Sequence, residues 1–214
     1  MKRWVGKICA SAAVAAGVIV MQAPGLAGAP RATYAAVGGP SSMPYGWMDF
    51  CRRNARECAG VDAQALDADL AKPQAWKVLE RINGWVNANI EPLTDMDHHG
   101  VEDHWSYPDD GKGDCEDYVL LKRRMLINAG FPRQSLLITV VRDDRNEGHA
   151  ILTVKSNLGE YVLDNKRGAI LPWAETGYRF VKRQSQTDPN VWVEVGPGAP
   201  TPVVASSPRP RQTR

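Results

Sequence analysis

Three side chains of the 214-residue sequence have the types and order needed for nucleophilic catalysis: Cys115, His149 and Asp164. A cysteine is a strong nucleophile as its thiolate, a histidine can take the thiol proton, and a carboxylate can orient the imidazole. Each residue alone has an ordinary interpretation, as an inert thiol, a surface imidazole or a turn-forming aspartate. Together they predict a Cys-His-Asp triad.

Cys115 is expected at the first turn of a helix. Asp114 can serve as its N-cap, Asp117 stands where a capping box places an acidic side chain, and Gly130 marks the end of the helix. Unpaired backbone N–H groups and the positive end of the helix dipole stabilise an anion at this position. The position therefore favours a reactive thiol.

His149 and Asp164 lie at the ends of two expected strands that follow this helix. Strand-like stretches occupy residues 136–141, 149–154, 161–163, 179–181 and 191–195. With a turn centred near residues 156–157, His149 and Asp164 fall opposite each other, give or take a residue, at about 5 Å. A slip of one residue would turn one of the two side chains to the wrong face.

An earlier helix is expected after Pro73. Its apolar residues recur at intervals of three and four, as on a helix that covers a core: Trp76, Leu79, Ile82, Val86 and Ile90. The helix should end at Glu91-Pro92. Because the helices precede the strands, the predicted fold class is α+β, with helices packed on an antiparallel sheet.

Residues 1–29 have the organisation of a secretory signal peptide. Lys2 and Arg3 precede an apolar run at 8–21, and small residues follow, with cleavage after Ala27 fitting best. A retained membrane anchor is the alternative, although a bilayer span needs about 20 apolar residues. We expect an exported, periplasmic protein. Its net charge of +2 gives no indication of a nucleic-acid partner.

The rest of the chain divides by composition into three parts. Residues 30–44 form an expected flexible lead-in, residues 45–195 a single domain, and residues 196–214 a disordered tail rich in Pro and Arg.

The cysteine count points to one free thiol. Signal removal takes Cys9 and leaves Cys51, Cys58 and Cys115. In a continuous helix Cys51 and Cys58 would lie about 10 Å apart, too far for a disulfide, so a bond between them requires a looped segment. We expect that bond, and Cys115 is then the unpaired cysteine in an oxidising compartment.

Several sequence runs resemble the bacterial transglutaminase-like cysteine peptidases. The runs are GKGDCEDY at 111–118, NEGHA at 146–150 and YVLDN at 161–165, with DHWSYP at 103–108 upstream and Trp192 near the end of the similar region. The resemblance covers roughly residues 45–195. It implies a papain-like, transglutaminase-like fold, the triad Cys115, His149 and Asp164, and proteolysis through a covalent acyl-enzyme.

The resemblance also implies partners. The family includes a periplasmic protease that releases adhesins, so the expected substrate is a large surface adhesin, and the expected regulator is an inner-membrane receptor. Family members of this type use calcium close to the nucleophile.

The acidic neighbours of Cys115 are candidate ligands for such a cation. Asp114, Glu116 and Asp117 would disfavour a thiolate as bare charges, and a hard cation bound by their oxygens would remove that conflict. We therefore expect a Ca²⁺ site there; the alternative is that these residues cap the helix. The histidines at 98, 99 and 104 do not have the spacing of a structural zinc site.

Two other functions remain open at this point. The same triad could transfer the acyl group to an amine, as transglutaminases do, or the fold could be a non-catalytic binding module, which an intact triad disfavours. An oxyanion hole would combine the backbone N–H of Cys115 with a second donor, for which Trp105 and Tyr107 are candidates.

Overall fold

The computed structural model describes residues 33–60 and 66–196. The four α-helices of these residues are α1 (Tyr45–Arg53), α2 (Pro73–Asn89), α3 (Asp95–His99) and α4 (Cys115–Asn128). The strands are β1 (Val37–Ser41), β2 (Glu91–Pro92), β3 (Lys112–Gly113), β4 (Leu136–Arg142), β5 (Gly148–Ser156), β6 (Gly159–Leu163), β7 (Leu171–Pro172), β8 (Arg179–Gln184) and β9 (Trp192–Val195). Short 3-10 turns η1, η2 and η3 occupy Ala55–Glu57, Arg133–Ser135 and Trp173–Glu175.

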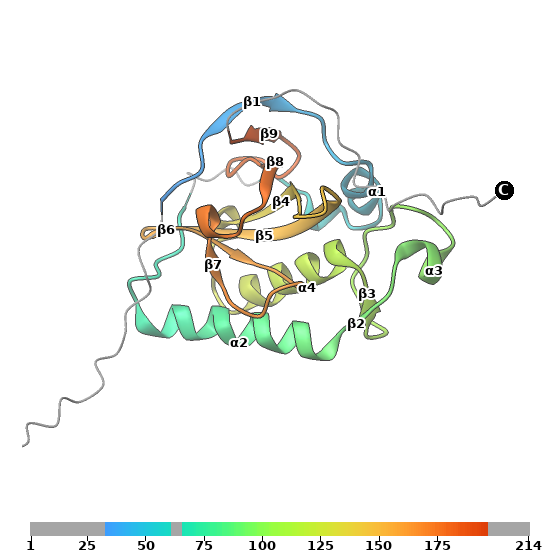
Figure 1. The fold of residues 1–214 in the computed structure, drawn as a ribbon, viewed down its shortest axis with the longest axis horizontal. Coiled ribbons are helices and arrows are strands. Elements are labelled where there is room, and N and C mark those ends of the chain that lie inside the picture. The colour runs from blue at the N-terminus through green and yellow to red at the C-terminus, as the bar shows by residue number, and fades with distance from the viewer. Residues whose placement is uncertain (1–32, 61–65, 197–214) are drawn as a thin grey trace, which may run out of the picture.

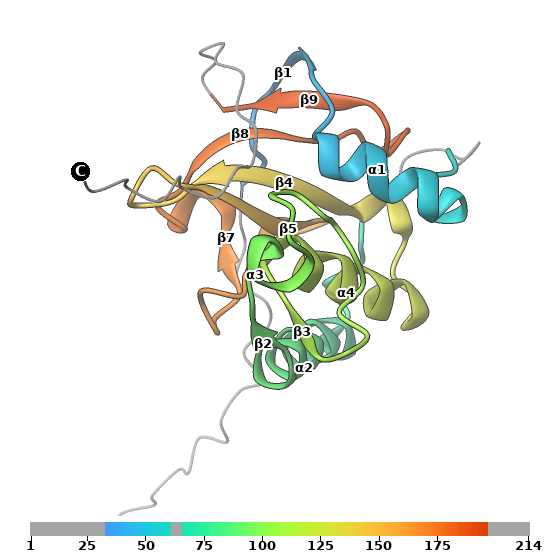
Figure 2. The ribbon, with the colours of Figure 1, turned by 90° about the vertical axis from the view of Figure 1, so that its right-hand side faces the viewer.

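One seven-stranded sheet organises the domain. Its strands run in the order β1-β9-β8-β4-β5-β6-β7, and every neighbouring pair is antiparallel. Helices α2 and α4 lie together on one side of this sheet, and α1 lies near the β9 side (Figures 1 and 2). A separate parallel pair, β2 with β3, leads into α4. The predicted α+β class is confirmed.

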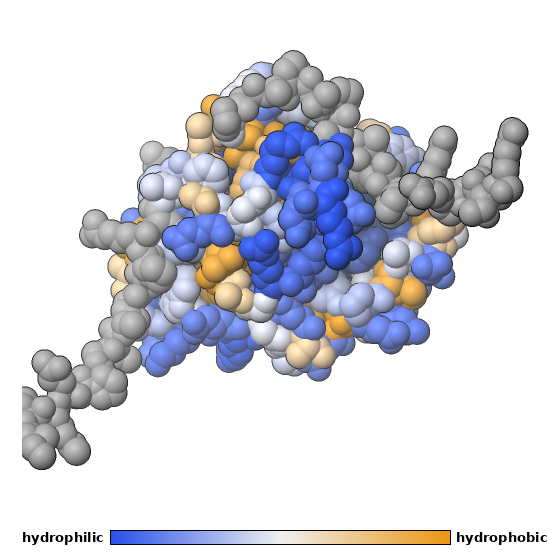
Figure 3. All heavy atoms as spheres, viewed as in Figure 1, coloured by the Kyte–Doolittle hydropathy of each residue, from blue (hydrophilic) through white to orange (hydrophobic). Residues whose placement is uncertain are grey.

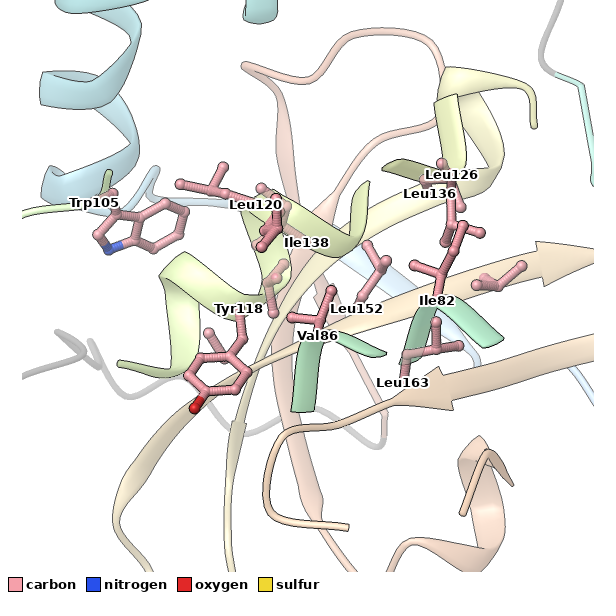
Figure 4. Close-up of a cluster of buried hydrophobic side chains, with 14 of the residues drawn as sticks. Ile82, Val86, Trp105, Tyr118, Leu120, Leu126, Leu136, Ile138, Leu152 and Leu163 are labelled. Atoms are coloured by element: carbon pink, nitrogen blue, oxygen red, sulfur yellow. The ribbon is translucent and has the colours of Figure 1, made fainter. Parts of the chain in front are cut away.

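The main core fills the space between the two long helices and the sheet. Figure 4 shows α2, α4 and strand side chains meeting there, among them Ile82, Val86, Leu126, Ile138 and Leu152. Residues 3 and 4 apart on α2 face this core, as its apolar period predicts. Because α4 packs on β5, the sheet fixes where the first turn of α4 lies.

A smaller apolar cluster covers the opposite side of the sheet. Val141, Ile151 and Val162 are buried there under three aromatic side chains, Trp173, Tyr178 and Phe180. Alternation along a strand explains the split, since Ile151 and its neighbours Ala150 and Leu152 point to opposite faces. The middle of the molecular face seen in Figure 3 is strongly hydrophilic, with scattered apolar side chains around it.

The expected disulfide is present. Cys51 and Cys58 are bonded with a Cα–Cα distance of 5.6 Å. Helix α1 ends at Arg53 and the chain turns through η1, which brings the two cysteines far closer than a straight helix would. Among the described residues Cys115 is the free cysteine.

Most predicted helices and strands are confirmed, but the segment expected as a flexible lead-in contains a strand. Helices α2 and α4 and strands β4, β5, β6, β8 and β9 lie where the sequence pattern placed them. Residues 37–41, expected in a flexible segment, instead form edge strand β1 against β9. This strand is almost wholly exposed and contains two glycines and a proline, so it lacks the apolar alternation that identifies a strand.

The expected signal peptide at 1–29 and most of the expected tail, residues 197–214, lie outside the described residues. None of the helices within the described ranges has both the length and the apolarity that crossing a membrane requires.

Candidate active site

Cys115 is the first residue of α4, as the sequence predicts. Its Sγ lies 3.4 Å from the backbone nitrogen of Ala150, which donates a hydrogen bond to it from β5. The thiol itself donates to Oε2 of Glu116 at 2.9 Å. The thiol is thus held between a helix N-terminus and the start of the strand that carries His149.

His149 and Asp164 form a buried pair. Nε2 of His149 lies 2.8 Å from Oδ1 of Asp164, and the side chains are 1% and 2% exposed. Nδ1 of His149 is buried and has no hydrogen-bond partner. With Nε2 donating to the carboxylate, Nδ1 is the nitrogen left to accept a proton.

The strand register differs from the predicted one by two residues. Leu152 pairs with Leu163 in the β5–β6 ladder, so continuing the ladder would align Asp164 with Ile151 rather than with His149. A shift of two keeps His149 and Asp164 on the same face, and they meet diagonally. The turn is centred between Asn157 and Leu158, one residue later than expected.

Asp164 is fixed by further hydrogen bonds. The backbone nitrogen of Lys166 donates to Oδ1 at 3.0 Å, and Nδ2 of Asn87, on α2, donates to its carbonyl oxygen at 2.8 Å. Burial alone would raise the pKa of Asp164. The hydrogen bonds that it accepts, first from His149, instead hold that pKa below its usual range.

The surroundings of Cys115 disfavour a thiolate. Burial raises the pKa of the Cys115 thiol well above its usual value, and the carboxylates of Glu116 and Asp114 add to the rise. Glu116 also has a strongly raised pKa, through burial and then Asp114. The helix N-terminus favours a thiolate at Cys115, but burial and the neighbouring carboxylates oppose this effect. This is the conflict that the sequence indicated.

The structure brings a fourth acidic residue to this flank. One carboxylate oxygen from each of Asp95, Asp114 and Asp117 lies within 4.8 Å of the others. Each of these residues has one buried carboxylate oxygen without a hydrogen-bond partner. Asp95 comes from α3, nineteen residues before Asp114, and no local spacing in the sequence connects the two.

Their pKa values rise for the same reason. Burial, and then the Asp95 carboxylate, raises the pKa of Asp114 to about 6. Burial raises the pKa of Asp117 to about 8 and also raises that of Asp95. Three buried carboxylates with unpartnered oxygens are a donor set that suits a hard cation such as Ca²⁺. The predicted ligands Asp114 and Asp117 belong to this group, and Glu116 belongs to a second one with Asp114 and Cys115.

The capping interpretation fits Asp117, whose carboxylate accepts a hydrogen bond from the backbone N–H of Asp114, but not the side chain of Asp114. Asp114 occupies the N-cap position of α4 but makes no side-chain cap hydrogen bond. Its Oδ2 accepts instead from the backbone nitrogen of Asp95 at 3.4 Å, and Asp117 accepts from the backbone nitrogen of Ser106 at 2.7 Å. A Cβ on Gly113 would lie 2.5 Å from Asp117 Oδ2, so only glycine fits there.

The three histidines beside this cluster do come together. His98 stacks on His99 with ring centroids 3.9 Å apart, and His99 lies 4.5 Å from His104. In the described part of the chain, however, the groups whose ligand atoms could jointly hold a metal consist of acidic residues and Cys115, without a histidine.

A pocket of about 500 Å³ opens over the thiol. Cys115 and His149 both line it, with Pro92 and Leu93 on one side and the β4–β5 hairpin on the other. Neither predicted oxyanion donor lines this pocket: Trp105 is buried and donates to Asp103, and Tyr107 packs beneath Arg124. The N–H groups of the first turn of α4 remain available.

A match to a family model shows to which protein family this chain belongs. The model of the bacterial transglutaminase-like cysteine proteinases matches residues 37–199. The chain belongs to this family. The match begins at β1. Cysteine proteolysis, the enzyme class predicted from the sequence, is the class of this family.

Solved structures similar to this chain include LapG of Legionella pneumophila. The EGTA-treated form is 26% identical with a TM-score of 0.45, and the match covers 51% of this chain and 62% of that one. A second LapG structure is 25% identical with a TM-score of 0.48, and the match covers 56% of this chain and 68% of that one. A calcium-bound form is 22% identical with a TM-score of 0.45, and the match covers 63% of this chain and 82% of that one. Comparison with curated proteins gives no match.

Proposed function

We propose that this chain is a cysteine endopeptidase that works through Cys115, His149 and Asp164. The observation that carries the proposal is the buried His149–Asp164 pair, which leaves Nδ1 of His149 without a partner, beside a pocket that His149 and Cys115 both line. Family membership supports the same reaction.

In the proposed reaction Nδ1 of His149 takes the proton of Cys115, and Sγ attacks the carbonyl carbon of the scissile peptide. The resulting oxyanion would be stabilised by N–H groups at the start of α4. The imidazolium then protonates the departing amine as the carbon–nitrogen bond breaks, which leaves a thioester. Water, deprotonated by His149, hydrolyses the thioester and releases Cys115.

Alkylation of Cys115 tests the nucleophile and its base. With calcium present to offset the acidic flank, we expect iodoacetamide to modify Cys115 faster than it modifies a free thiol. His149→Ala should slow that reaction by about 100-fold because the thiol loses its proton acceptor. Mass spectrometry would locate the label, and Cys115→Ala is the blank. Equal labelling rates in wild type and His149→Ala would contradict the proposal.

Incubation with a mixture of synthetic peptides of random sequence distinguishes hydrolysis of the thioester from acyl transfer to an amine. The wild type should produce cleaved peptides, and Cys115→Ala should not. If a labelled amine is incorporated into glutamine-containing peptides and no cleavage occurs, the enzyme is an acyl transferase instead.

We propose further that Asp95, Asp114 and Asp117 bind Ca²⁺, with Glu116 near them. Their shared space, their unpartnered buried oxygens and their raised pKa values support this site. When bound, the cation would offset the negative charge that keeps the Cys115 thiol protonated. Asp95 is thereby added to the calcium ligands that the sequence predicted.

Calcium should therefore accelerate alkylation of Cys115, by about tenfold relative to EGTA if it removes one unit of the pKa rise. Asp95→Asn should abolish that response. Asp97→Asn is the matched control, since Asp97 lies on the same helix, is exposed and bonds to Thr94. A calcium response that survives in Asp95→Asn would overturn the assignment.

Calcium binding should also depend on pH. Asp114 and Asp117 have pKa values of about 6 and about 8, so lowering the pH from about 8 to about 6 adds protons that compete with the cation. Isothermal titration near pH 7 in buffers of different ionisation enthalpy should show proton release on binding. An affinity independent of pH in this range would count against these ligands.

The location and substrate are proposed from the family resemblance. We place the mature protein in the periplasm and propose a large surface adhesin as substrate and an inner-membrane receptor as regulator. Comparing the surface proteins of cells that carry wild type and Cys115→Ala would test this, because the adhesin should be shed only with the active enzyme.

A further inference from the structure

Tyr178 contacts both members of the His149–Asp164 pair. Its hydroxyl donates to Oδ2 of Asp164 at 2.6 Å, the carboxylate oxygen that His149 does not use. Its ring meets the His149 imidazole edge to face, with centroids 5.7 Å apart. Both oxygens of Asp164 therefore have side-chain donors, and the imidazole has an aromatic wall.

The backbone holds Tyr178 in this place. Tyr178 directly precedes β8, whose first residue, Arg179, pairs with Arg142 of β4. Gly177 has a φ of 71°, a conformation that glycine adopts readily, and Oγ1 of Thr176 accepts the backbone N–H of Tyr178 at 3.2 Å. The tight turn delivers the side chain to the sheet face of His149.

Arg167 also contacts the ring. Its guanidinium lies 4.7 Å from the centroid of Tyr178. Arg167 follows shortly after Asp164 on the loop between β6 and β7, so one loop supplies both the carboxylate and the group that restrains the tyrosine. The ring of Tyr178 thus contacts both Arg167 and His149.

The ring of Tyr178 adds cover from the sheet face opposite the core helices. Tyr178 belongs to the apolar cluster on that face, whereas α2 reaches Asp164 through Nδ2 of Asn87 and α4 places Lys122 near it. The pair is nevertheless almost inaccessible, with side chains 1% and 2% exposed. Excluding water from a hydrogen bond between an imidazole and a carboxylate strengthens it.

We propose that Tyr178 is a positioning residue of this enzyme: its hydroxyl orients Asp164, and its ring, held by Arg167, shields the His149–Asp164 hydrogen bond from water. The inference rests on the proposed function, since it assigns a role toward that triad. Loss of the hydroxyl leaves a buried carboxylate oxygen short of a donor, which raises the pKa of Asp164 toward its ordinary value.

The decisive variant is Tyr178→Phe, which keeps the ring and removes the hydroxyl. We expect kcat for peptide cleavage to fall by about tenfold, the effect of one hydrogen bond to a charged group, with KM unchanged within about twofold. The acid limb of the alkylation rate of Cys115 should move to higher pH, because Asp164 now takes up its proton at a higher pH.

Two more variants separate the hydroxyl from the ring. Tyr178→Leu also removes the aromatic wall and should lower kcat further than Tyr178→Phe. Tyr34→Phe is the matched control: Tyr34 donates to the carbonyl of Ser156 at 2.8 Å and has Lys155 over its ring at 5.6 Å, remote from the triad. Its kinetics and acid limb should equal those of the wild type.

The outcomes distinguish failure of the proposed function from failure of the positioning role of Tyr178. If the wild type shows no His149-dependent alkylation of Cys115, the proposed function fails and this inference with it. If the wild type reacts as expected but Tyr178→Phe matches it in kcat and in the acid limb, only the inference fails. A fall in kcat with an unmoved acid limb and a lowered melting temperature would show a structural role and would also overturn it.

Discussion

Asp164→Ala is expected to lower kcat/KM for peptide cleavage by about 10⁴-fold, the scale of loss found when the orienting carboxylate of a Ser-His-Asp triad is removed. In this enzyme the carboxylate fixes the tautomer, because Oδ1 accepts from Nε2 of His149 and leaves Nδ1 unprotonated. Without that acceptor the buried imidazole loses both its orientation and its preferred tautomer. Steady-state cleavage of a peptide substrate measures the effect.

Asp164→Asn should lose much less, about 10- to 100-fold, which corresponds to one charge-assisted hydrogen bond. The backbone N–H of Lys166 donates to Oδ1, so the amide should place its oxygen there and still accept from His149. Its NH₂ would then face Tyr178, whose hydroxyl can rotate to accept. Equal losses in the alanine and asparagine variants would contradict this account of the hydrogen bonds.

Lys122→Met should stabilise the protein at pH 6 and remove a large pH dependence of its stability. Lys122 is 0% exposed on α4, and its Nζ has no hydrogen-bond partner among the described residues. Burial lowers its pKa from 10.5 to about 7. The ammonium thus costs the folded state up to about 5 kcal/mol at low pH, at 1.36 kcal/mol per pKa unit.

The sign follows from proton binding. Below about pH 7 Lys122 is charged in both states, and the full cost of burial applies. Between about pH 7 and 10.5 the unfolded state binds more protons than the folded state, so the free energy of unfolding rises with pH. Methionine fills a similar volume without an amine, so the free energy of unfolding of the variant should lack that rise. The variant should therefore be more stable than the wild type by the largest margin at the lowest pH.

Urea unfolding of both proteins across this pH range measures the difference, in which the shared contributions of other groups cancel. Lys182→Met is the matched control, because Lys182 is also buried but its Nζ donates to the carbonyl of Ser42 at 2.8 Å. That variant should be destabilised. A Lys122→Met protein less stable than the wild type at pH 6 would mean that the amine has a stabilising partner.

The sequence by itself determined the elements and the chemistry. The apolar period of α2, the glycine and proline after α4 and the strand-like runs gave both their type and their order, because these signals are local. Cys115 at a helix start, His149 at a strand start and Asp164 after the next strand were assigned from residue type and position. The free thiol followed from cysteine arithmetic, and the Cys51–Cys58 bond confirms it.

The tertiary structure decided which of these residues touch. It set the β5–β6 register two residues from expectation, which local patterning cannot fix, although face alternation preserved the contact of His149 with Asp164. It added Asp95 to the acidic flank and Tyr178 to the imidazole, both through contacts between segments far apart in the chain. Burial, which only the packed fold defines, then gave Asp117 and Lys122 their shifted pKa values.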